Sequence, residues 1–196
     1  ATLALPAAAF AQYEEHEKDA RRWNVNGLAG VMSYAGEAAS ITQPGAAYGV
    51  TASGDIASMY GLSLDGEIGY LGGVYNSEAL ISSEKSTIVE NGGQAAVKIG
   101  PELGAFEPYA LGGVSVQRLN VVYEEATGGL IRDGTHTRIP VGVGFDLKPG
   151  GRDGPLTLGA RGTYSFATNN SAFQALTPNT NSASMWTGLA EVGGSF

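Results

Sequence analysis

Few residues of this chain have side chains that could carry out covalent chemistry. The sequence contains no cysteine, which removes thiolate nucleophiles, thiolate metal sites and disulfides together, and it contains two histidines. His136 has hydroxyl side chains near it in sequence, and Glu124 and Glu125 precede it, so one hypothesis is a hydrolase site. No spacing ties His136 to a particular serine, and the alternative is a solvent-exposed loop histidine. Two histidines do not supply a histidine-based metal site, and we expect no cofactor.

The remaining chemistry resides in isolated charges of both signs. Seven of them lie in segments where polar and apolar residues alternate: Asp65, Glu67, Lys98, Glu102, Asp146, Arg161 and Glu191. If these side chains face one another, Lys98 and Arg161 can pair with the carboxylates. The same groups could instead line a gated pore. The choice depends on the elements that position them.

Alternation with a period of two residues predicts strands throughout the chain. The strong segments are Leu62–Val74, Ala95–Leu103, Ile139–Lys148, Leu156–Phe166 and Trp186–Phe196, and the weaker ones are Trp23–Met32, Tyr48–Ala52 and Tyr109–Leu119. Gly112-Gly113 interrupts the last of these and predicts a bulge. About eight strands without an amphipathic helix favour a closed barrel.

The connections between these segments alternate in length. Short, turn-like links are expected at Ser53–Asp55, Pro101–Glu107 and Pro149–Pro155, and long polar links at Gly36–Ala46, Asn76–Gly93, Glu124–Arg138 and Ala167–Ser184. An up-and-down barrel in a membrane has short turns on its periplasmic rim and long loops outside. The pattern therefore predicts that the N- and C-termini are periplasmic and that the long loops are extracellular.

Composition indicates which face of these strands meets lipid. Charged residues make up 15% of the chain, against ~25% in a typical soluble domain, and the net charge of −8 excludes a nucleic-acid partner. The polar faces carry small residues and isolated charges, which suits the interior of a narrow barrel. The apolar faces carry aromatic residues near strand ends: Trp23, Tyr48, Tyr70, Tyr109, Tyr164, Phe166, Trp186 and Phe196. We therefore predict an eight-stranded antiparallel up-and-down transmembrane β-barrel, all-β, with the seven charges in its lumen. An interior just filled by side chains favours a plug of ion pairs over a pore.

The N-terminus has the pattern of an export signal. Residues 1–11 form an apolar run of small residues that ends in Ala9-Phe10-Ala11, a cleavage pattern that makes Gln12 the first mature residue. The basic region that should precede such a run is absent, so further residues are expected upstream. The domain organisation predicted is a signal-peptide remnant at 1–11, a charged periplasmic tail at 12–22 and the barrel at 23–196.

The last segment, Trp186–Phe196, ends in phenylalanine and resembles the terminal strand that the barrel-assembly machinery reads, with Trp186, Gly188 and Phe196 as its main features. The segment Glu107–Val114 is similar to the beginning of a strand that is common in small outer-membrane β-barrels. With the signal-like start and the alternating strands, the chain resembles the small outer-membrane β-barrels of Gram-negative bacteria, of the OmpA-transmembrane-domain and OmpX type. This resemblance implies an outer-membrane location and contact with outer-membrane lipid, lipopolysaccharide and the assembly machinery.

The resemblance says little about activity, because members of this family range from inert anchors to enzymes. The primary hypothesis is a non-enzymatic anchor or scaffold whose loops serve adhesion, envelope integrity or an envelope protein partner. Three alternatives stay open: a narrow, porin-like pore for small solutes or ions, a soluble secreted ligand-binding barrel with its apolar face inside, and a lipid-modifying enzyme built around His136.

Overall fold

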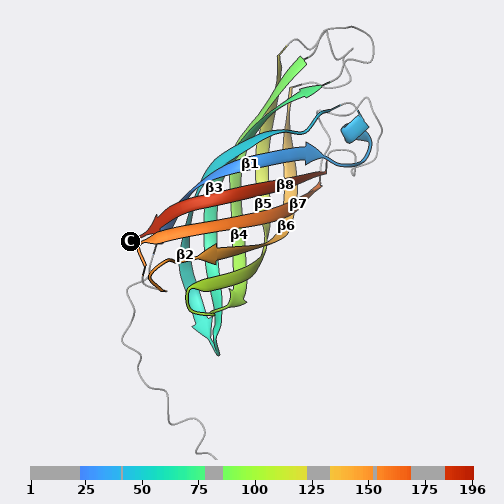
Figure 1. Cartoon of the computed structure of the whole chain (residues 1–196). Coiled ribbons are helices and arrows are strands. Elements are labelled where there is room, and N and C mark those ends of the chain that lie inside the picture. Colours follow the sequence, from blue (N-terminus) through green and yellow to red (C-terminus); the bar gives the residue numbers. More distant parts are fainter. Residues whose placement is uncertain (1–22, 41, 78–85, 123–132, 152–153, 169–183) are drawn as a thin grey trace, which may run out of the picture.

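The chain folds into a closed β-barrel. The computed structural model describes residues 23–40, 42–77, 86–122, 133–151, 154–168 and 184–196. The elements are β1 (Trp23–Tyr34), η2 (Gly36–Ser40), β2 (Gly45–Met59), β3 (Leu62–Ser77), β4 (Ser86–Pro101), β5 (Phe106–Val122), β6 (Gly134–Leu147), β7 (Leu156–Ala167) and β8 (Met185–Ser195). Each strand pairs antiparallel with the next, and β8 closes the barrel on β1 (Figure 1). The predicted eight-stranded antiparallel up-and-down β-barrel is thus confirmed, whereas the signal remnant and the tail expected before Trp23 lie outside the described residues.

The strands are tilted because their register is staggered. A path that steps from Trp23 to its partner in β2 and onward through every strand returns to β1 at Ser33, ten residues further along. In a closed barrel such a stagger requires the strands to tilt by ~35–45° from the axis. An eight-stranded barrel leaves an interior about wide enough for side chains to fill. In the described part of the chain, no helix is long and apolar enough to cross a membrane.

The two ends of the barrel differ in their connections. At one end, called here the short-turn end, lie the β2–β3, β4–β5 and β6–β7 turns together with both ends of the sheet. Trp23 and Phe196 meet there through two backbone hydrogen bonds, at 3.3 and 2.8 Å. At the opposite, long-loop end lie the connections 35–44, 78–85, 123–133 and 168–184. The predicted alternation of short and long connections holds only in part, because the β6–β7 connection (148–155) and the β3–β4 connection (78–85) are equally long, at eight residues each, and several of the boundaries differ from those predicted.

The turn predicted at Ser53–Asp55 is wrong, because β2 continues through these residues to Met59. The chain reverses instead at Tyr60-Gly61, where φ is +55° and +76°. Two successive positive φ values are those of the hairpin turn whose twist matches antiparallel strands. Near the predicted turn the β2–β3 register shifts between Asp55 and Ala57, so Ile56 forms a bulge within a continuing strand.

Two other boundaries and one predicted bulge also differ from the predictions. The β3–β4 hairpin extends to Ser77 and Ser86, so the link predicted over 76–93 is shorter. Strand β6 begins at Gly134, inside the link predicted over 124–138. The bulge predicted at Gly112-Gly113 is absent, since the register of β5 with β4 and β6 is the same before and after these glycines. Glycine can occupy a regular ladder position, so a glycine pair alone does not indicate a bulge.

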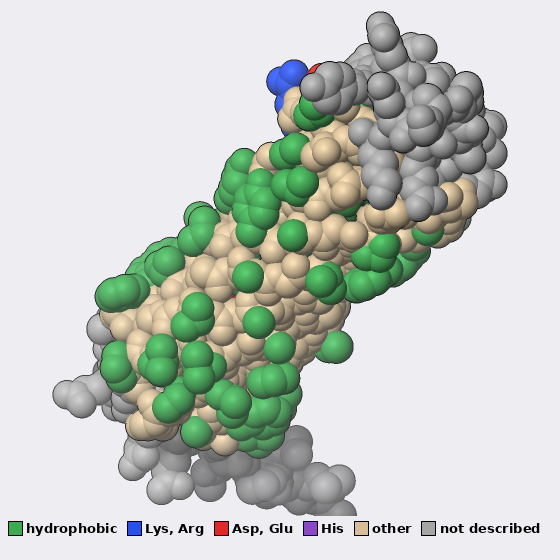
Figure 2. All heavy atoms as spheres, turned by 45° about the horizontal axis from the view of Figure 1, so that its top comes forward, with side chains coloured by type: hydrophobic (Ala, Val, Ile, Leu, Met, Phe, Trp, Pro, Cys, Tyr) green, Lys and Arg blue, Asp and Glu red, His purple; other side chains and the backbone are tan. Residues whose placement is uncertain are grey.

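The outer wall of the barrel is apolar. Ile68, Val97, Val143 and Leu158 expose 63%, 43%, 67% and 40% of their surfaces, on four different strands. Figure 2 shows hydrophobic side chains spread along the wall, with charged side chains visible on this face only near the long-loop end. The predicted orientation, apolar residues outward and polar residues inward, is confirmed. It excludes the hypothesis of a soluble barrel whose apolar face points inside.

The outward aromatic side chains form two belts. The short-turn belt consists of Trp23, Phe106, Phe145 and Phe196, and the long-loop belt of Tyr48, Tyr70, Tyr164, Phe166 and Trp186. Within them the rings of Phe106 and Phe145 lie 5.6 Å apart, and those of Tyr164 and Phe166 4.9 Å. Tyr109 was predicted on this face and is instead buried inside, because the unbroken register of β5 keeps odd-numbered residues inward.

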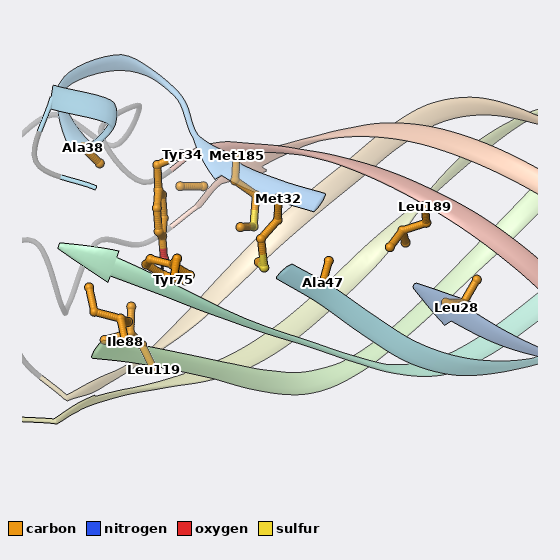
Figure 3. Packing of buried hydrophobic residues seen from close by; sticks show 11 residues of the cluster. Leu28, Met32, Tyr34, Ala38, Ala47, Tyr75, Ile88, Leu119, Met185 and Leu189 are labelled. Carbon is orange, nitrogen blue, oxygen red and sulfur yellow. The ribbon is translucent and has the colours of Figure 1, made fainter. Parts of the chain in front are cut away.

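The apolar part of the interior lies toward the long-loop end. Leu28, Met32, Ala47, Tyr75, Ile88, Leu119, Met185 and Leu189 belong to one buried cluster, shown in Figure 3. These side chains come from six strands. The inside of this barrel is therefore a packed core in which apolar side chains lie next to charged ones: Leu28 is the cross-strand partner of Glu191, and Leu119 is that of Glu90.

Candidate functional site

Five of the seven charges predicted for the lumen form one buried cluster, called here the central charge cluster: Glu67, Lys98, Asp146, Arg161 and Glu191. Lys98 Nζ lies 2.9 Å from Glu67 Oε2 and 3.9 Å from Asp146 Oδ2. Arg161 bridges the two glutamates, with Nη1 2.6 Å from Glu67 Oε1 and Nε 3.1 Å from Glu191 Oε1. Two cations and three carboxylates from five strands are thereby held in one layer across the barrel.

Neutral side chains complete this layer. The Tyr109 hydroxyl donates a hydrogen bond to Glu191 Oε1 at 3.1 Å, and Asn26 Nδ2 donates to Glu191 Oε2 at 3.4 Å. Lys98 Nζ lies 4.5 Å from the centroid of the Tyr109 ring, within cation–π range. Removing buried charges from water is costly, and the several partners of Glu67, Arg161 and Glu191 offset part of that cost. The layer therefore fixes which residues of the strands face one another.

The other two predicted lumen residues, Asp65 and Glu102, lie at the mouth of the barrel. They line a cavity of about 40 Å³ at the short-turn end, together with Asp55, Glu107 and Lys148. Glu102 accepts a hydrogen bond from Ser58 Oγ at 2.9 Å, and Lys148 Nζ lies 2.5 Å from Glu107 Oε2. The mouth is hence acidic and has room for one or two water molecules.

A second buried polar group, not predicted from the sequence, lies toward the long-loop end. This long-loop-end cluster contains Tyr34, Tyr75, Glu90, Gln117 and Arg138. Arg138 Nη1 donates to Glu90 Oε1 and to Gln117 Oε1, and Arg138 Nη2 donates to the Tyr34 hydroxyl at 3.2 Å. The Tyr34 hydroxyl donates to Glu90 Oε2 at 2.8 Å and lies 2.5 Å from that of Tyr75. Four strands and the end of β1 are thus joined by one hydrogen-bonded network.

Extending the alternation of the strong strands would have predicted that Glu90 and Arg138 of this cluster face inward. Val97 and Ala95 face outward. Because side chains alternate along a strand, the even-numbered Glu90 of β4 faces inward. Ile139 and Val141 also face outward, so the even-numbered Arg138 and His136 of β6 face inward. The predicted long links at Asn76–Gly93 and Glu124–Arg138 put Glu90 and Arg138 in loops, because polar residues near long links resemble loop residues.

His136 is fully buried in strand β6, so the expectation of a solvent-exposed loop histidine is wrong. Its side chain points into the barrel beside the long-loop-end cluster, where Glu90 is a charged neighbour. Glu124 and Glu125, the acids proposed to act with it, lie outside the described residues. The described residues thus place the His136 side chain inside the barrel and not on its outer wall.

The described interior has little open space. A cavity of about 20 Å³, lined by Met32, Gln94, Gln117, Arg161 and Met185 among others, separates the two polar clusters. One water molecule fits a cavity of this size. Among the described residues, no group of three or more histidine, aspartate or glutamate side chains is arranged to hold a metal ion. Chemically, the arrangement pairs charges inside the barrel.

Comparison with known proteins supports the fold at the level of architecture. No family model matches the chain, and no curated protein sequence is similar to it. Solved structures do match. The fold is that of the small outer-membrane barrels. The attachment invasion locus protein Ail of Yersinia pestis aligns at 10% identity with a TM-score of 0.52, covering 90% of this chain and 98% of Ail.

Two further structures agree. Ail in complex with the heparin analogue sucrose octasulfate gives a TM-score of 0.54 over the same coverage. The outer-membrane protein OprG of Pseudomonas aeruginosa gives 0.52 at 13% identity, covering 90% of this chain and 96% of OprG. These neighbours support the broad class of small outer-membrane barrels expected from the sequence, and do not single out the OmpA type.

Proposed function

We propose that this chain is an integral protein of the bacterial outer membrane, in which the barrel is the anchor and the long-loop end carries a non-enzymatic scaffold role in adhesion, envelope integrity or partner binding. The observation that carries the proposal is the inverted polarity of the barrel: its wall is apolar and its charges are buried inside. Such a wall is stable only against hydrocarbon, and two aromatic belts at its edges are typical of a barrel that meets two membrane interfaces.

In this proposal the short-turn end faces the periplasm. Its support is that both ends of the sheet meet there and that two of its three connections, 60–61 and 102–105, are shorter than any at the other end, as is typical of the periplasmic turns of bacterial outer-membrane barrels. Residues 1–11 would be the remnant of an export signal and residues 12–22 a periplasmic tail. The outer wall would contact outer-membrane lipid, and lipopolysaccharide on the long-loop side.

We also propose that β8 is the strand recognised by the barrel-assembly machinery. Trp186, Gly188 and Phe196 all lie on its outward parity, where a membrane-embedded partner could reach them. Substituting Phe196 by alanine is expected to lower the amount of folded barrel in the outer membrane, with unfolded chain accumulating in the periplasm. Unchanged levels of folded protein would refute this role.

The first test is whether the barrel is embedded in a membrane. We expect the protein to be extracted from envelopes by detergent and not by buffer or salt, and to migrate differently on a detergent gel before and after boiling. Release into buffer without detergent would refute the proposal.

The second test separates the scaffold from the pore. Because two buried polar clusters and the apolar side chains packed beside them fill most of the described interior, planar bilayers containing the protein are expected to stay silent at moderate voltage. Regular conductance steps that change in Lys98→Ala or Arg161→Ala would replace the scaffold by the pore.

Non-enzymatic function is supported by the position of His136 inside the barrel. We expect His136→Ala to leave the acyl-chain composition of lipopolysaccharide unchanged when the protein is expressed in cells. A deacylation that disappears in this variant would establish an enzyme instead.

A further inference from the structure

The edge of strand β2 is open at the short-turn end. Strand β1 begins at Trp23, which pairs with Gly54, whereas β2 continues to Met59. Residues 55–59 therefore have β3 on one side and, in the described part of the chain, no strand on the other. Figure 1 shows the β2–β3 hairpin extending beyond the ends of β1 and β8. A strand edge with free N–H and C=O groups is a template for pairing with another strand.

The hydrogen bonds of Trp23 indicate how this edge could be paired. Its N–H donates to the Phe196 carbonyl, and its own carbonyl accepts from the Phe196 N–H, so both groups point to β8. Successive residues of an antiparallel strand alternate in the neighbour that they bond. One residue earlier, a continued β1 would direct its N–H and C=O to β2, where the register places Asp55 opposite. Arg22 occupies that position in the sequence.

The alternation of side chains along β1 indicates where Arg22 would point. Asn26 is buried in the barrel and Asn24 lines the cavity of the mouth, so even-numbered residues of β1 face inward. Arg22 continues this alternation, whereas Arg21 has the outward parity of Trp23. A continued β1 would therefore hold one guanidinium over the mouth and the other outside it.

The mouth has too few cations for its carboxylates. Its described lining contains five carboxylates and one ammonium, and that ammonium, on Lys148, lies 2.5 Å from Glu107. Asp55 and Asp65 are direct cross-strand partners, and like charges in such a pair repel each other. Asp146 lines the same cavity and exposes 7% of its surface, and its Oδ1 atom accepts no hydrogen bond from the described residues. The mouth thus favours a further cationic group.

Arginine on the same chain suits this mouth better than a free cation. In the described part of the chain, the acidic side chains are not gathered closely enough to hold a metal ion. A guanidinium carries several donors in a planar fork, so one arginine can serve two separate carboxylates. A group tethered next to its site also binds at a high effective concentration. Arg22 directly precedes the first residue of β1, so its tether is as short as a chain allows.

We infer that residues 18–22 add to the open edge of β2 as a continuation of β1, and that Arg22 pairs with Asp55 and Asp65 at the mouth. The inference goes beyond the proposed scaffold role and depends only on the barrel and its register. The added strand gives the backbone of residues 55–59 a partner and closes the acidic mouth with a cation. An edge occupied in this way no longer pairs with a second copy of the chain.

The first test is a zero-length cross-link in the full chain, folded in detergent micelles. Carbodiimide joins a lysine ammonium to a carboxylate that it contacts, and Arg22→Lys keeps the positive charge at the proposed position. Arg21→Lys is the matched control, because it makes the same exchange one residue away on the opposite face. Mass spectrometry identifies the linked peptides, and mixing isotope-labelled with unlabelled protein separates links within one chain from links between chains.

We expect Arg22→Lys to be linked to Asp55 or Asp65 of the same chain, and Arg21→Lys to give about tenfold less of these links because its side chain points to the other face. Adding Asp55→Asn to Arg22→Lys should leave the link to Asp65 alone. Heat-dependent gel migration of each variant shows that its barrel is folded.

The second test follows the backbone of the added strand by hydrogen exchange. Proline has no N–H, so Arg22→Pro removes the donor that would face β2, whereas Arg21→Pro removes one that would face away from it. The amide hydrogen of Asp55 is expected to exchange about two- to tenfold faster in Arg22→Pro than in Arg21→Pro, the range of one hydrogen bond.

Four outcomes would overturn the inference. They are equal cross-linking of Arg22→Lys and Arg21→Lys, no link from Arg22→Lys to either aspartate, links found mainly between chains, and equal exchange of the Asp55 amide in the two proline variants. Links mainly between chains would make a second copy the occupant of the β2 edge.

Discussion

A charged substitution on the outer wall tests whether that wall is in contact with lipid or with water. Val143 is the most suitable position, because 67% of its surface is exposed and its cross-strand neighbours are Ala110 and Gly162. It stands between Phe145 of the short-turn belt and Val141, whose partner is Tyr164 of the long-loop belt. Val143 therefore lies near the middle of the apolar wall.

The expected cost of Val143→Arg follows from that depth. Arginine at the midplane of a barrel wall costs about 2–4 kcal/mol of folding free energy, and about 0–1 kcal/mol near an interface. Val122 provides the matched control, since it also faces outward but ends β5 beyond the long-loop belt. We expect Val122→Arg to cost at most ~1 kcal/mol. The difference between the two variants removes the intrinsic effect of exchanging valine for arginine.

The assay is reversible unfolding by guanidinium in phospholipid vesicles, followed by tryptophan fluorescence and by heat-dependent gel migration. If the wall met water instead, an exposed valine could be exchanged for arginine within about 0.5 kcal/mol at both positions. Equal and small costs for the two variants would therefore refute the reasoning.

Three further predictions address the interior and the turns. Arg161→Met should destabilise the barrel by ~3–5 kcal/mol in the same unfolding assay, because it leaves Glu67 and Glu191 with too few cations, and adding Glu191→Gln should recover part of this loss; no recovery would argue against the pairing. Tyr34→Phe should cost ~1–3 kcal/mol, more than Tyr75→Phe, because the Tyr34 hydroxyl both donates to Glu90 and accepts from Arg138; the reverse order would contradict the network. Tyr60→Asn should stabilise the barrel by ~0.4–1 kcal/mol, because Tyr60 is 97% exposed and has a positive φ that asparagine adopts more readily; destabilisation would show that the Tyr60 ring has a partner.

Much of the fold could be predicted because the alternation is a direct consequence of strand geometry. Successive side chains point to opposite faces, so one apolar residue known to face outward determines the direction of its neighbours. This is why Ile68, Val97, Val143 and Leu158 were placed correctly. The same reasoning placed Glu67, Lys98 and Arg161 inside, where the structure shows them in contact.

The predictions are wrong where the residue types of a segment were given more weight than the inward–outward alternation of its strand. Ser53–Asp55 has the residues of a turn, but a strand accepts them when the hairpin has a better turn at Tyr60-Gly61. Gly112-Gly113 suggested a bulge and thereby the wrong face for Tyr109. A glycine adopts regular strand angles as readily as irregular ones, so its presence does not determine the phase of the residues beside it.

The long-loop-end cluster could not be predicted as a network for a different reason. The alternation of side chains predicts that Glu90 and Arg138 face inward. Which inward residues contact one another depends on how the register of the strands is staggered around the barrel. Tyr34, Glu90 and Arg138 are brought to one height by the ten-residue offset around the sheet, a property of all eight strands together. A single strand, considered separately, does not contain this information.

The depth of the two tryptophans in a bilayer tests the central claim most directly. The chain has two, Trp23 in the short-turn belt and Trp186 in the long-loop belt, and both are exposed on the wall. Single-tryptophan variants in vesicles containing brominated phospholipids are expected to be quenched most by bromine near the headgroups, less by bromine at the chain ends, and little by aqueous iodide. Strong quenching by iodide and none by either brominated lipid, for both tryptophans, would contradict a membrane-spanning barrel.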